Sequence, residues 1–572
     1  MRRLVLLLAL TLLPASGCHS TGSPESASGG IGEACTSAAQ CRDGLTCATS
    51  IDFPQATCEL SCDPQSRSSC PDGYACTAMQ SGRYCLQRCL TPLTCKADEL
   101  CLGASGSLDR TCLPKSAQPG SCGYLPQLVA GGPVGPATEP AACQKPVVAS
   151  VLPPSQVQHL GTHAVNDEVR FEVPAGTYGL SVVEQAVSAG DSLTYQGFTL
   201  DNAAVPLTLT GPAGQVLYDD FDVSDPPAQQ YVYVGAPASV QNVVGLPNTS
   251  VALSDVAAHD GLPAGTWTAV VNDYANECPR VNAEDPTAAC DGGGSVGQYD
   301  VTVLTRPKPE SGRVDLAFYL VNEGLLTSEA AVSDPAVVRM VRTVAEIYGQ
   351  HGICPATVTF YDLPAWARAK YAAGIDADEV SPCSNLFQLF TLSQPTNTLN
   401  FFLVQSISST LSGGYSIVGL DGTIPGPSSF GGSVHSGAAV SSADLEGDAL
   451  SACGPRRDYL GCGPDFVGYI TAHEGGHWLG LFHTTEADGE LFDPLNDTPT
   501  CSCEACAPSA EQGACGGVPD GGYTMVTGAD CSSGGPTCGG ADDLMFWLID
   551  GQAAGHLSDE QVQVMKSNVV VQ

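Results

Sequence analysis

The chain has 572 residues, of which 43% are hydrophobic and 14% charged, and this length is enough for about three or four domains. Its 22 Lys and Arg residues face 60 Asp and Glu residues, which gives a net charge of -38. A chain so acidic offers no basic surface to displace counterions from phosphates, so we expect no nucleic-acid partner.

The N-terminus predicts export. Arg2 and Arg3 precede an apolar run over residues 4–13, and a lipobox-like end leads to Cys18. The run is too short to span a bilayer, so we expect a signal peptide over 1–18, lipidation at Cys18 and a Ser/Gly-rich tether over 19–30. Without Cys18 the 27 cysteines become an even set, as in a fully disulfide-bonded exported protein. The expected location is the bacterial cell envelope, as an outer membrane lipoprotein anchored at Cys18, and plain secretion is the alternative.

Residues 31–122 form a cysteine-rich internal repeat of three units. Each unit holds four cysteines: Cys35, Cys41, Cys47 and Cys58; Cys62, Cys70, Cys76 and Cys85; Cys89, Cys95, Cys101 and Cys112. A unit of about 27 residues is too small for an apolar core, so we expect two disulfides in each. Zinc knuckles are the alternative, but an oxidising compartment and the lack of paired CxxC spacing disfavour them. Cys122 and Cys143 are expected to close the linker that follows.

Residues 155–306 predict an all-β sandwich. Alternating apolar runs at 169–173, 207–209 and 267–271 lie between Gly, Pro and Asp turns. The segments 173–177 and 262–267 resemble the sandwich domains attached to secreted bacterial peptidases, which implies a docking or stabilising role. Four nearby carboxylates could bind Ca²⁺, although a solvated loop is the favoured interpretation. They are Asp219, Asp220, Asp222 and Asp225.

Residues 312–572 predict a third domain of α/β (α+β) type with a twisted sheet. Strands are expected at 316–321, 357–361 and 399–404, and Asp334-Pro335 predicts the start of a helix. Ser558 begins a capping box, which predicts a last helix with Val562, Met565 and Val569 on one side. Cys501-x-Cys503-x-x-Cys506 could bind a metal, but disulfides are favoured outside the cytosol.

The most informative segment is His473-Glu474-Gly475-Gly476-His477-Trp478-Leu479-Gly480-Leu481-Phe482-His483. Residues four apart lie on the same face of a helix, so His473 and His477 can bind one metal ion. Gly480 permits a left-handed turn that ends the helix and brings in His483 as third ligand. Three imidazoles leave the fourth position of a zinc ion open, which is typical of a catalytic site. Histidines that merely satisfy core hydrogen bonds are the alternative, and the full pattern disfavours it.

The extended pattern resembles that of the metzincin metallopeptidases, which also have a methionine turn beneath the metal. The segment 541–547 is similar to that turn, with Met545 as its methionine. Within the clan, residues 477–484 and the Asp497-Thr498-Pro499 segment are similar to the pappalysin (cytophagalysin-like) family. The resemblance covers roughly residues 312–570. It departs at Trp547, where some metzincins carry a tyrosine that acts as an extra ligand.

These features predict a zinc-dependent endopeptidase that hydrolyses extracellular or periplasmic proteins. The zinc ligands are His473, His477 and His483, and Glu474 is the general base that acts on the zinc-bound water. A surface adhesin with a vestigial peptidase fold and a zinc hydrolase of another class are the alternatives. The expected partners are a protein or peptide substrate and, through Cys18, a membrane. The sequence does not indicate an oligomeric state.

Overall fold

The computed structural model describes most of the chain from residue 30 onward. It describes residues 30–48, 56–62, 69–79, 82–88, 99–103, 110–114, 126–141, 149–150, 157–188, 193–195, 198–200, 208–214, 216–219, 239–242, 248–254, 261–273, 276, 290–291, 296–307, 312–321, 326–378, 383–394, 396–410, 415–427, 430–445, 449–454, 457–493, 495–508, 515, 525–533 and 535–572. Several predictions fall outside the described residues. They are the signal peptide with Cys18, most of the tether, Cys89, Cys95, Cys122, Cys143, Asp220, Asp222 and Asp225.

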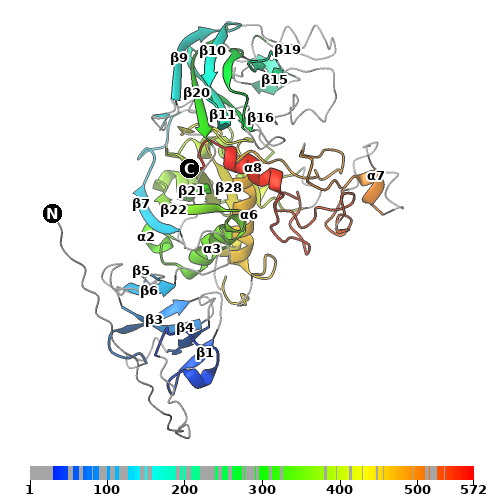
Figure 1. Cartoon of the computed structure of the whole chain (residues 1–572). Coiled ribbons are helices and arrows are strands. Elements are labelled where there is room, and N and C mark those ends of the chain that lie inside the picture. Colours follow the sequence, from blue (N-terminus) through cyan, green and yellow to red (C-terminus); the bar gives the residue numbers. More distant parts are fainter. Residues whose placement is uncertain are drawn as a thin grey trace, which may run out of the picture.

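The protein is multidomain, with many sheets, few helices and a disulfide-rich N-terminal region (Figure 1). That region consists of small antiparallel hairpins, each of two strands. They are β1 (Thr46–Ala48) with β2 (Thr57–Glu59), β3 (Tyr74–Met79) with β4 (Gly82–Gln87), and β5 (Glu99–Gly103) with β6 (Arg110–Pro114), and η1 (Ala38–Gln40) precedes them.

The first two cysteine units are held as predicted, by two disulfides each. In both units the first cysteine bonds to the third and the second to the fourth. The bonds are Cys35–Cys47, Cys41–Cys58, Cys62–Cys76 and Cys70–Cys85. Because these eight cysteines form disulfides, the first two units are not zinc sites.

Two antiparallel sheets pack around one apolar core between residues 157 and 307. One sheet has the order β10-β18-β14-β15 and the other β16-β17-β11-β20-β9. The strands are β9 (Val157–Ala164), β10 (Glu168–Val173), β11 (Thr177–Ser188), β14 (Thr208–Thr210), β15 (Val216–Asp219), β16 (Ser239–Asn242), β17 (Asn248–Ser254), β18 (Gly265–Val270) and β20 (Gln298–Pro307), with a small sheet of β12 (Leu193–Tyr195), β13 (Phe198–Leu200) and β19 (Cys290–Asp291) beside them. β10 shows the expected alternation, because Val169, Phe171 and Val173 are buried while the residues between them are exposed.

A six-stranded mixed sheet forms the centre of the molecule, in the order β26-β28-β24-β21-β22-β7. Its strands are β7 (Gln127–Pro133), β21 (Gly312–Leu320), β22 (Ile353–Asp362), β24 (Thr398–Val404), β26 (Gly419–Asp421) and β28 (Ala438–Ser441). Only β26 runs antiparallel to its neighbour. The three strands expected from the sequence are confirmed as β21, β22 and β24. The edge strand β7 was not predicted, and it comes from the segment that precedes the sandwich.

Helices cover both faces of this mixed sheet. Successive residues of β21 point to opposite sides, so the neighbours of their side chains show which helices lie on each face. Leu316, Phe318 and Leu320 pack in one core with α3 (Pro335–Gly349), α6 (Gly463–Trp478) and α8 (Asp559–Ser567). Ala317 and Tyr319 pack in another core with α4 (Ala365–Tyr371) and α5 (Asn385–Phe390). The remaining short elements are α2 (Ser328–Ala331), β8 (Ala149–Ser150), β23 (Ile375–Asp376), β25 (Ile407–Ser408), β27 (Phe430–Gly431), η4 (Ala443–Leu445) and α7 (Cys503–Cys506).

A buried ion-pair network joins the start of α6 to α3. The Arg339 guanidinium donates from Nε and Nη2 to the two oxygens of Asp465, at 2.7 and 2.6 Å, and both side chains are fully buried. Arg457 pairs with the same carboxylate at 2.8 Å and with Glu346. Asp465 lies in the first turn of α6, where a negative charge also complements the helix dipole. The network therefore ties the first turn of α6 to α3.

The C-terminal helix α8 connects the mixed sheet with the sandwich, and Figure 1 shows it between the two. Its predicted capping box is present, since Ser558 accepts from the backbone of Gln561 and Gln561 bonds back. The prediction that Val569 shares one side of this helix is wrong. The helix ends at Ser567, and Val569 packs instead with Val183 and Leu304 of the sandwich.

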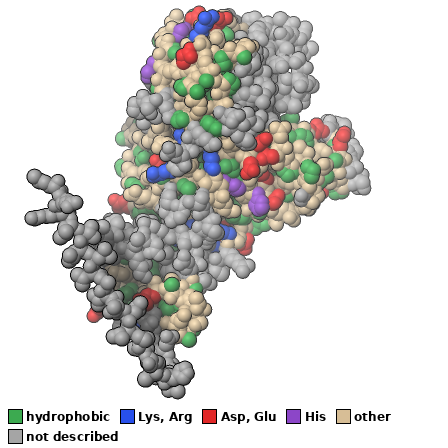
Figure 2. Space-filling view, in the orientation of Figure 1, with side chains coloured by type: hydrophobic (Ala, Val, Ile, Leu, Met, Phe, Trp, Pro, Cys, Tyr) green, Lys and Arg blue, Asp and Glu red, His purple; other side chains and the backbone are tan. Residues whose placement is uncertain are grey.

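Figure 2 shows Asp and Glu side chains on the sandwich, on the central part and on the N-terminal region. Within the described residues, no helix combines the length and the apolar character that crossing a membrane requires.

Candidate metal centre

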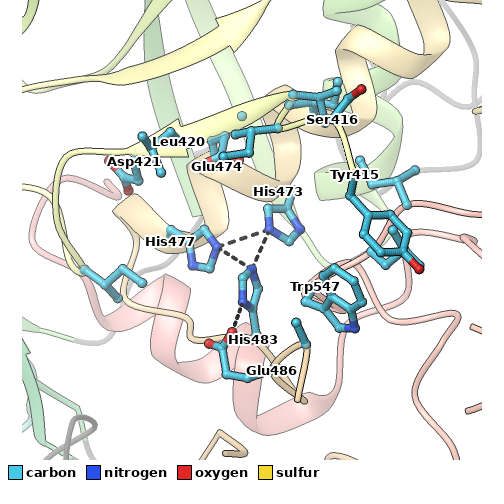
Figure 3. Close-up of a pocket in the computed structure, with 18 of the residues that line it drawn as sticks. Tyr415, Ser416, Leu420, Asp421, His473, Glu474, His477, His483, Glu486 and Trp547 are labelled. Carbon is cyan, nitrogen blue, oxygen red and sulfur yellow. Dashed lines mark hydrogen bonds and ion pairs between the residues drawn. The ribbon is translucent and has the colours of Figure 1, made fainter. Parts of the chain in front are cut away.

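Three imidazoles from α6 and the turn after it converge on one point (Figure 3). His473 and His477 are one helical turn apart in α6, and both are buried. Gly480 has φ 112°, a left-handed conformation that turns the chain so that His483 faces the helix. The Nε2 atoms are 3.1 Å apart for His473 and His477, and each is 3.2 Å from Nε2 of His483.

The other ring nitrogen of each imidazole faces an oxygen that can only accept. Nδ1 of His473 donates to the Leu544 carbonyl at 2.6 Å, and Nδ1 of His477 donates to the Leu481 carbonyl at 2.7 Å. Nδ1 of His483 lies 3.0 Å from a carboxylate oxygen of Glu486. The neutral rings therefore carry their protons on Nδ1, and three Nε2 lone pairs point at each other. Such an arrangement needs an electrophile at its centre.

The spacing of these nitrogens fits a zinc ion. With Zn–N bonds of about 2.0–2.1 Å, tetrahedral coordination places the nitrogens roughly 3.3–3.4 Å apart, close to the separations observed. The second ring nitrogens also have the carbonyl and carboxylate partners that zinc-bound histidines normally have. Among the described residues, this is the group of metal-binding side chains whose donor atoms are not already joined in disulfides.

Burial keeps the two helical ligands neutral. It lowers the pKa of His473 to about 3, helped by the nearby His483 ring. It lowers the pKa of His477 well below its ordinary value, again with help from the neighbouring histidines. Protons therefore compete weakly with a metal for these nitrogens.

Glu474 lies beside the three histidines and beneath β26. Its side chain is only 5% exposed, and burial raises its pKa to about 8. A Cβ atom on Gly419 would lie 2.0 Å from a carboxylate oxygen of Glu474, so glycine is needed there to let the carboxyl pass under the strand. The carboxyl thus stands next to the three histidines in a buried position.

Met545 packs against α6 at Gly476. It is fully buried, and a Cβ atom on Gly476 would lie 2.5 Å from its sulfur. The turn that carries Met545 holds two of the histidines. Leu544 accepts from His473, and the Met545 carbonyl accepts from Thr484 N, next to His483, at 3.0 Å. The segment 541–547 therefore contacts His473 and the residue next to His483.

A cleft of about 630 Å³ leads to the histidines. The segment 415–421, which ends in β26, forms one wall, and residues from α6 and from 547–549 form the other. Asp421 lies at one end of the cleft and Tyr415 at the other, with Glu474 between them (Figure 3). Burial, with the nearby Glu474, raises the pKa of Asp421 well above its ordinary value.

β26 leaves one backbone edge unpaired. Val418 O accepts from Ser441 N at 2.8 Å, and Gly422 N donates to Gly437 O at 3.0 Å. Neighbouring residues in a strand direct their peptide groups to opposite sides, so those of Gly419 and Asp421 point away from β28. No strand among the described residues pairs with that outer edge.

Trp547 cannot ligate a metal ion, and its indole contacts Val526 and Tyr415 instead. Its indole Nε1–H donates to the Val526 carbonyl at 2.9 Å. Its ring meets the ring of Tyr415 edge-on, with centroids 5.4 Å apart. The three cysteines at 501, 503 and 506 form disulfides to Cys531, Cys515 and Cys538, as favoured over metal binding.

The structure brings together His473, Glu474, His477, His483 and Met545. Sequence reasoning missed Glu486 and the segment 415–421. Glu486 has a signal that could have revealed it, because it follows His483 by three residues and zinc-bound histidines usually have a carboxylate or carbonyl partner. The segment 415–421 has none, since its place depends on pairing with β28.

Comparisons with known proteins identify no family. No protein-family model matches the chain, and no curated protein matches it. Among solved structures, a family two carbohydrate esterase from Cellvibrio japonicus is 11% identical, with a TM-score of 0.09. The match covers 38% of this chain and about half (52%) of the esterase chain. A similarity this low carries no argument about fold or activity.

Proposed function

We propose that the protein is a zinc-dependent endopeptidase of the metzincin type, related to the pappalysins. One observation carries the proposal. Three Nε2 lone pairs converge at 3.1–3.2 Å with all three Nδ1 atoms already occupied, and the Glu474 carboxyl stands beside them. The buried methionine turn beneath the histidines supports the metzincin assignment.

His473, His477 and His483 would hold the zinc. Bound there, zinc would lower the pKa of a water molecule and polarise a substrate carbonyl. Glu474 then accepts the proton of the attacking water and returns it to the departing amine, so it acts first as general base and then as general acid. The position of Glu474 favours this role, because its carboxyl lies beside the histidines and lines the cleft that leads to them.

The free edge of β26 supports an extended polypeptide as substrate. The outward peptide groups of Gly419 and Asp421 can pair with the backbone of an added strand. That strand would pass over Glu474 and the histidines, because Gly419 lies directly above the Glu474 carboxyl. Backbone pairing is independent of side chains, which suits an enzyme that cleaves within polypeptides.

The disulfides support a role outside the cytosol, and we propose that the substrates are extracellular or periplasmic proteins. Lipid attachment at Cys18 belongs to the same proposal.

The test is a comparison of the protein with its Glu474→Gln variant. Both are measured for zinc content and for cleavage of a denatured protein, with and without a chelator. We expect one zinc per chain in both proteins. We expect the variant to cleave about 10²–10⁴-fold more slowly than the wild type. Glu490→Gln, which changes an exposed glutamate, is the matched control and should cleave normally. If wild-type protein loaded with zinc cleaves no polypeptide, the peptidase proposal is wrong.

A further inference from the structure

The backbone segment 543–545 accepts two hydrogen bonds from α6. The Tyr469 hydroxyl donates to the Asp543 carbonyl at 3.2 Å. One helical turn later, Nδ1 of His473 donates to the Leu544 carbonyl at 2.6 Å. The acceptor that orients the His473 ring thus belongs to a short stretch of backbone, and whatever holds this stretch also holds the ring.

The same segment is held from the other side by α8, through the side chain of Gln561. Its Nε2 donates to Oδ1 of the Asp543 carboxylate at 3.1 Å, and this oxygen also accepts from Met545 N at 2.7 Å. The Gln561 side chain is fully buried, and Asp543 is only 5% exposed. The bonds of this carboxylate therefore tie the residues on both sides of Leu544 to α8.

The Gln561 amide can serve in only one orientation. Its Oε1 accepts from Ser558 N at 2.7 Å in the capping box, so its NH₂ group faces Asp543. A glutamate completes a capping box as well as a glutamine does, but its carboxylate has no proton to donate to Asp543. The contact with Asp543 thus requires an amide where the helix cap alone does not.

We propose that Gln561 is a positioning residue of the metal centre, which through Asp543 keeps the Leu544 carbonyl in place against His473. This inference rests on the metal site of the proposed function and adds a residue of the C-terminal helix to it. Without the amide, the buried Asp543 carboxylate would lose a donor, and the segment 543–545 could shift. Nδ1 of His473 would then lose its acceptor, and the ring would bind a metal ion less tightly.

The test compares the full-length wild type with Gln561→Met, because methionine is about as large as glutamine and has no N–H donor. Zinc affinity is measured by competition with a zinc-binding dye at pH 7, at a temperature where circular dichroism shows both proteins folded. We expect the affinity of the variant to be about 10–100-fold lower. Equal affinities would overturn the inference, whatever the variant does to stability.

Two control variants separate positioning from a merely structural role. Ser558→Ala weakens the cap of α8 but keeps the bond between Gln561 and Asp543. Gln552→Met makes the same substitution at an exposed position. Both should bind zinc like the wild type. If Ser558→Ala lowers the affinity as much as Gln561→Met does, the helix cap explains the effect and the inference is wrong.

A second measurement follows the geometry of the site. Co²⁺ bound in place of zinc has a visible absorption spectrum that depends on its coordination geometry. We expect Gln561→Met saturated with Co²⁺ to have an altered spectrum, because His473 would meet the ion at another angle. Gln552→Met should keep the wild-type spectrum. A wild-type spectrum in Gln561→Met would overturn the inference even if its affinity were lower.

If Gln561→Met does not fold, Gln561→Glu takes its place. This variant keeps the acceptor for Ser558 N, and when ionised it cannot donate to Asp543. We expect the same loss of zinc affinity relative to the wild type, measured for both proteins at pH 9. Equal affinities at this pH would overturn the inference.

This inference and the peptidase proposal can fail separately. Wild-type protein that binds zinc but cleaves no polypeptide would overturn the peptidase function, while the affinities and the Co²⁺ spectra would still decide the role of Gln561. Cleavage that requires Glu474, together with unchanged zinc binding in Gln561→Met, would overturn only the role of Gln561. Wild-type protein that binds no zinc would overturn both.

Discussion

At the scale of single residues, the three candidate ligands differ in what holds them. His473 and His477 donate to backbone carbonyls, whose positions are set by α6 and by the methionine turn. His483 lies outside the helix and donates to a side chain, the Glu486 carboxylate. A negative partner makes the ring a better metal ligand and fixes its orientation. The most weakly anchored ligand thus has the strongest acceptor.

We therefore predict that Glu486→Gln lowers zinc affinity by about 10–100-fold. Gln can still accept from Nδ1 of His483, but it carries no charge. The affinity is measured by competition with a zinc-binding dye at pH 7. Glu490→Gln should bind zinc like the wild type. Equal affinities of the wild type and Glu486→Gln would show that Glu486 does not support the metal centre.

At the scale of elements, the position of α6 depends on the buried carboxylate at its start. Asp465 accepts from Arg339, Arg457 and the Thr343 hydroxyl, and no part of it is exposed. Removing its charge would leave the fully buried Arg339 without its ionic partner and would take away one of the two carboxylates that pair with Arg457, which is far more costly than losing an exposed ion pair.

We predict that Asp465→Asn lowers the free energy of unfolding by about 3–5 kcal/mol. Urea denaturation followed by circular dichroism measures the loss. The exposed Asp444→Asn is the control and should change stability by less than about 0.5 kcal/mol. A loss of under about 1 kcal/mol in Asp465→Asn would mean that the network does not hold α6.

Local signals in the sequence predicted the elements well. Asp334-Pro335 begins α3, Ser558 caps α8, and Gly480 turns left-handed after α6, because each signal acts within a few residues of itself. Long-range pairing was not predictable in this way. β7 pairs with β22 more than two hundred residues later, and its seven residues are half exposed, so its apolar pattern is weak.

In the candidate site, too, the residues with local signals were predictable and those placed by long-range pairing were not. His473, Glu474, His477 and His483 share one segment whose spacing encodes their geometry, so the sequence alone indicated them. The cleft wall at 415–421 is brought there by β28, and the approach of Val526 to Trp547 depends on the disulfide-bonded loop. Neither relation leaves a pattern in the sequence.

At the scale of the whole molecule, acid should weaken the fold through His435. Its Nδ1 donates to the Gly422 carbonyl at 2.6 Å, its ring lies against Phe387, and burial lowers its pKa from 6.5 to about 4. A histidine whose pKa is lower in the folded state stabilises the fold above pH 6.5, and this contribution is lost as the pH falls toward 4.

We predict that the stability difference between the wild type and His435→Gln shrinks as the pH falls from 7 to 4, by at most about 3 kcal/mol. Urea denaturation at pH 7, 5.5 and 4 measures the free energy of unfolding of both proteins. Comparing the two cancels the titration of all other groups. A difference that stays constant over this range would show that His435 does not titrate with folding.

The pairing of β7 with β22 makes the sandwich an insertion. The mixed sheet takes its edge strand from residues 127–133 and the rest from residues after 312, so the polypeptide leaves this sheet, forms the sandwich and returns. A truncated protein that starts at residue 312 would expose the edge of β22 and be prone to aggregate. The smallest stable unit that carries the three histidines should therefore begin near residue 126, and the sandwich, attached at both its ends, cannot swing away from the mixed sheet on a single hinge.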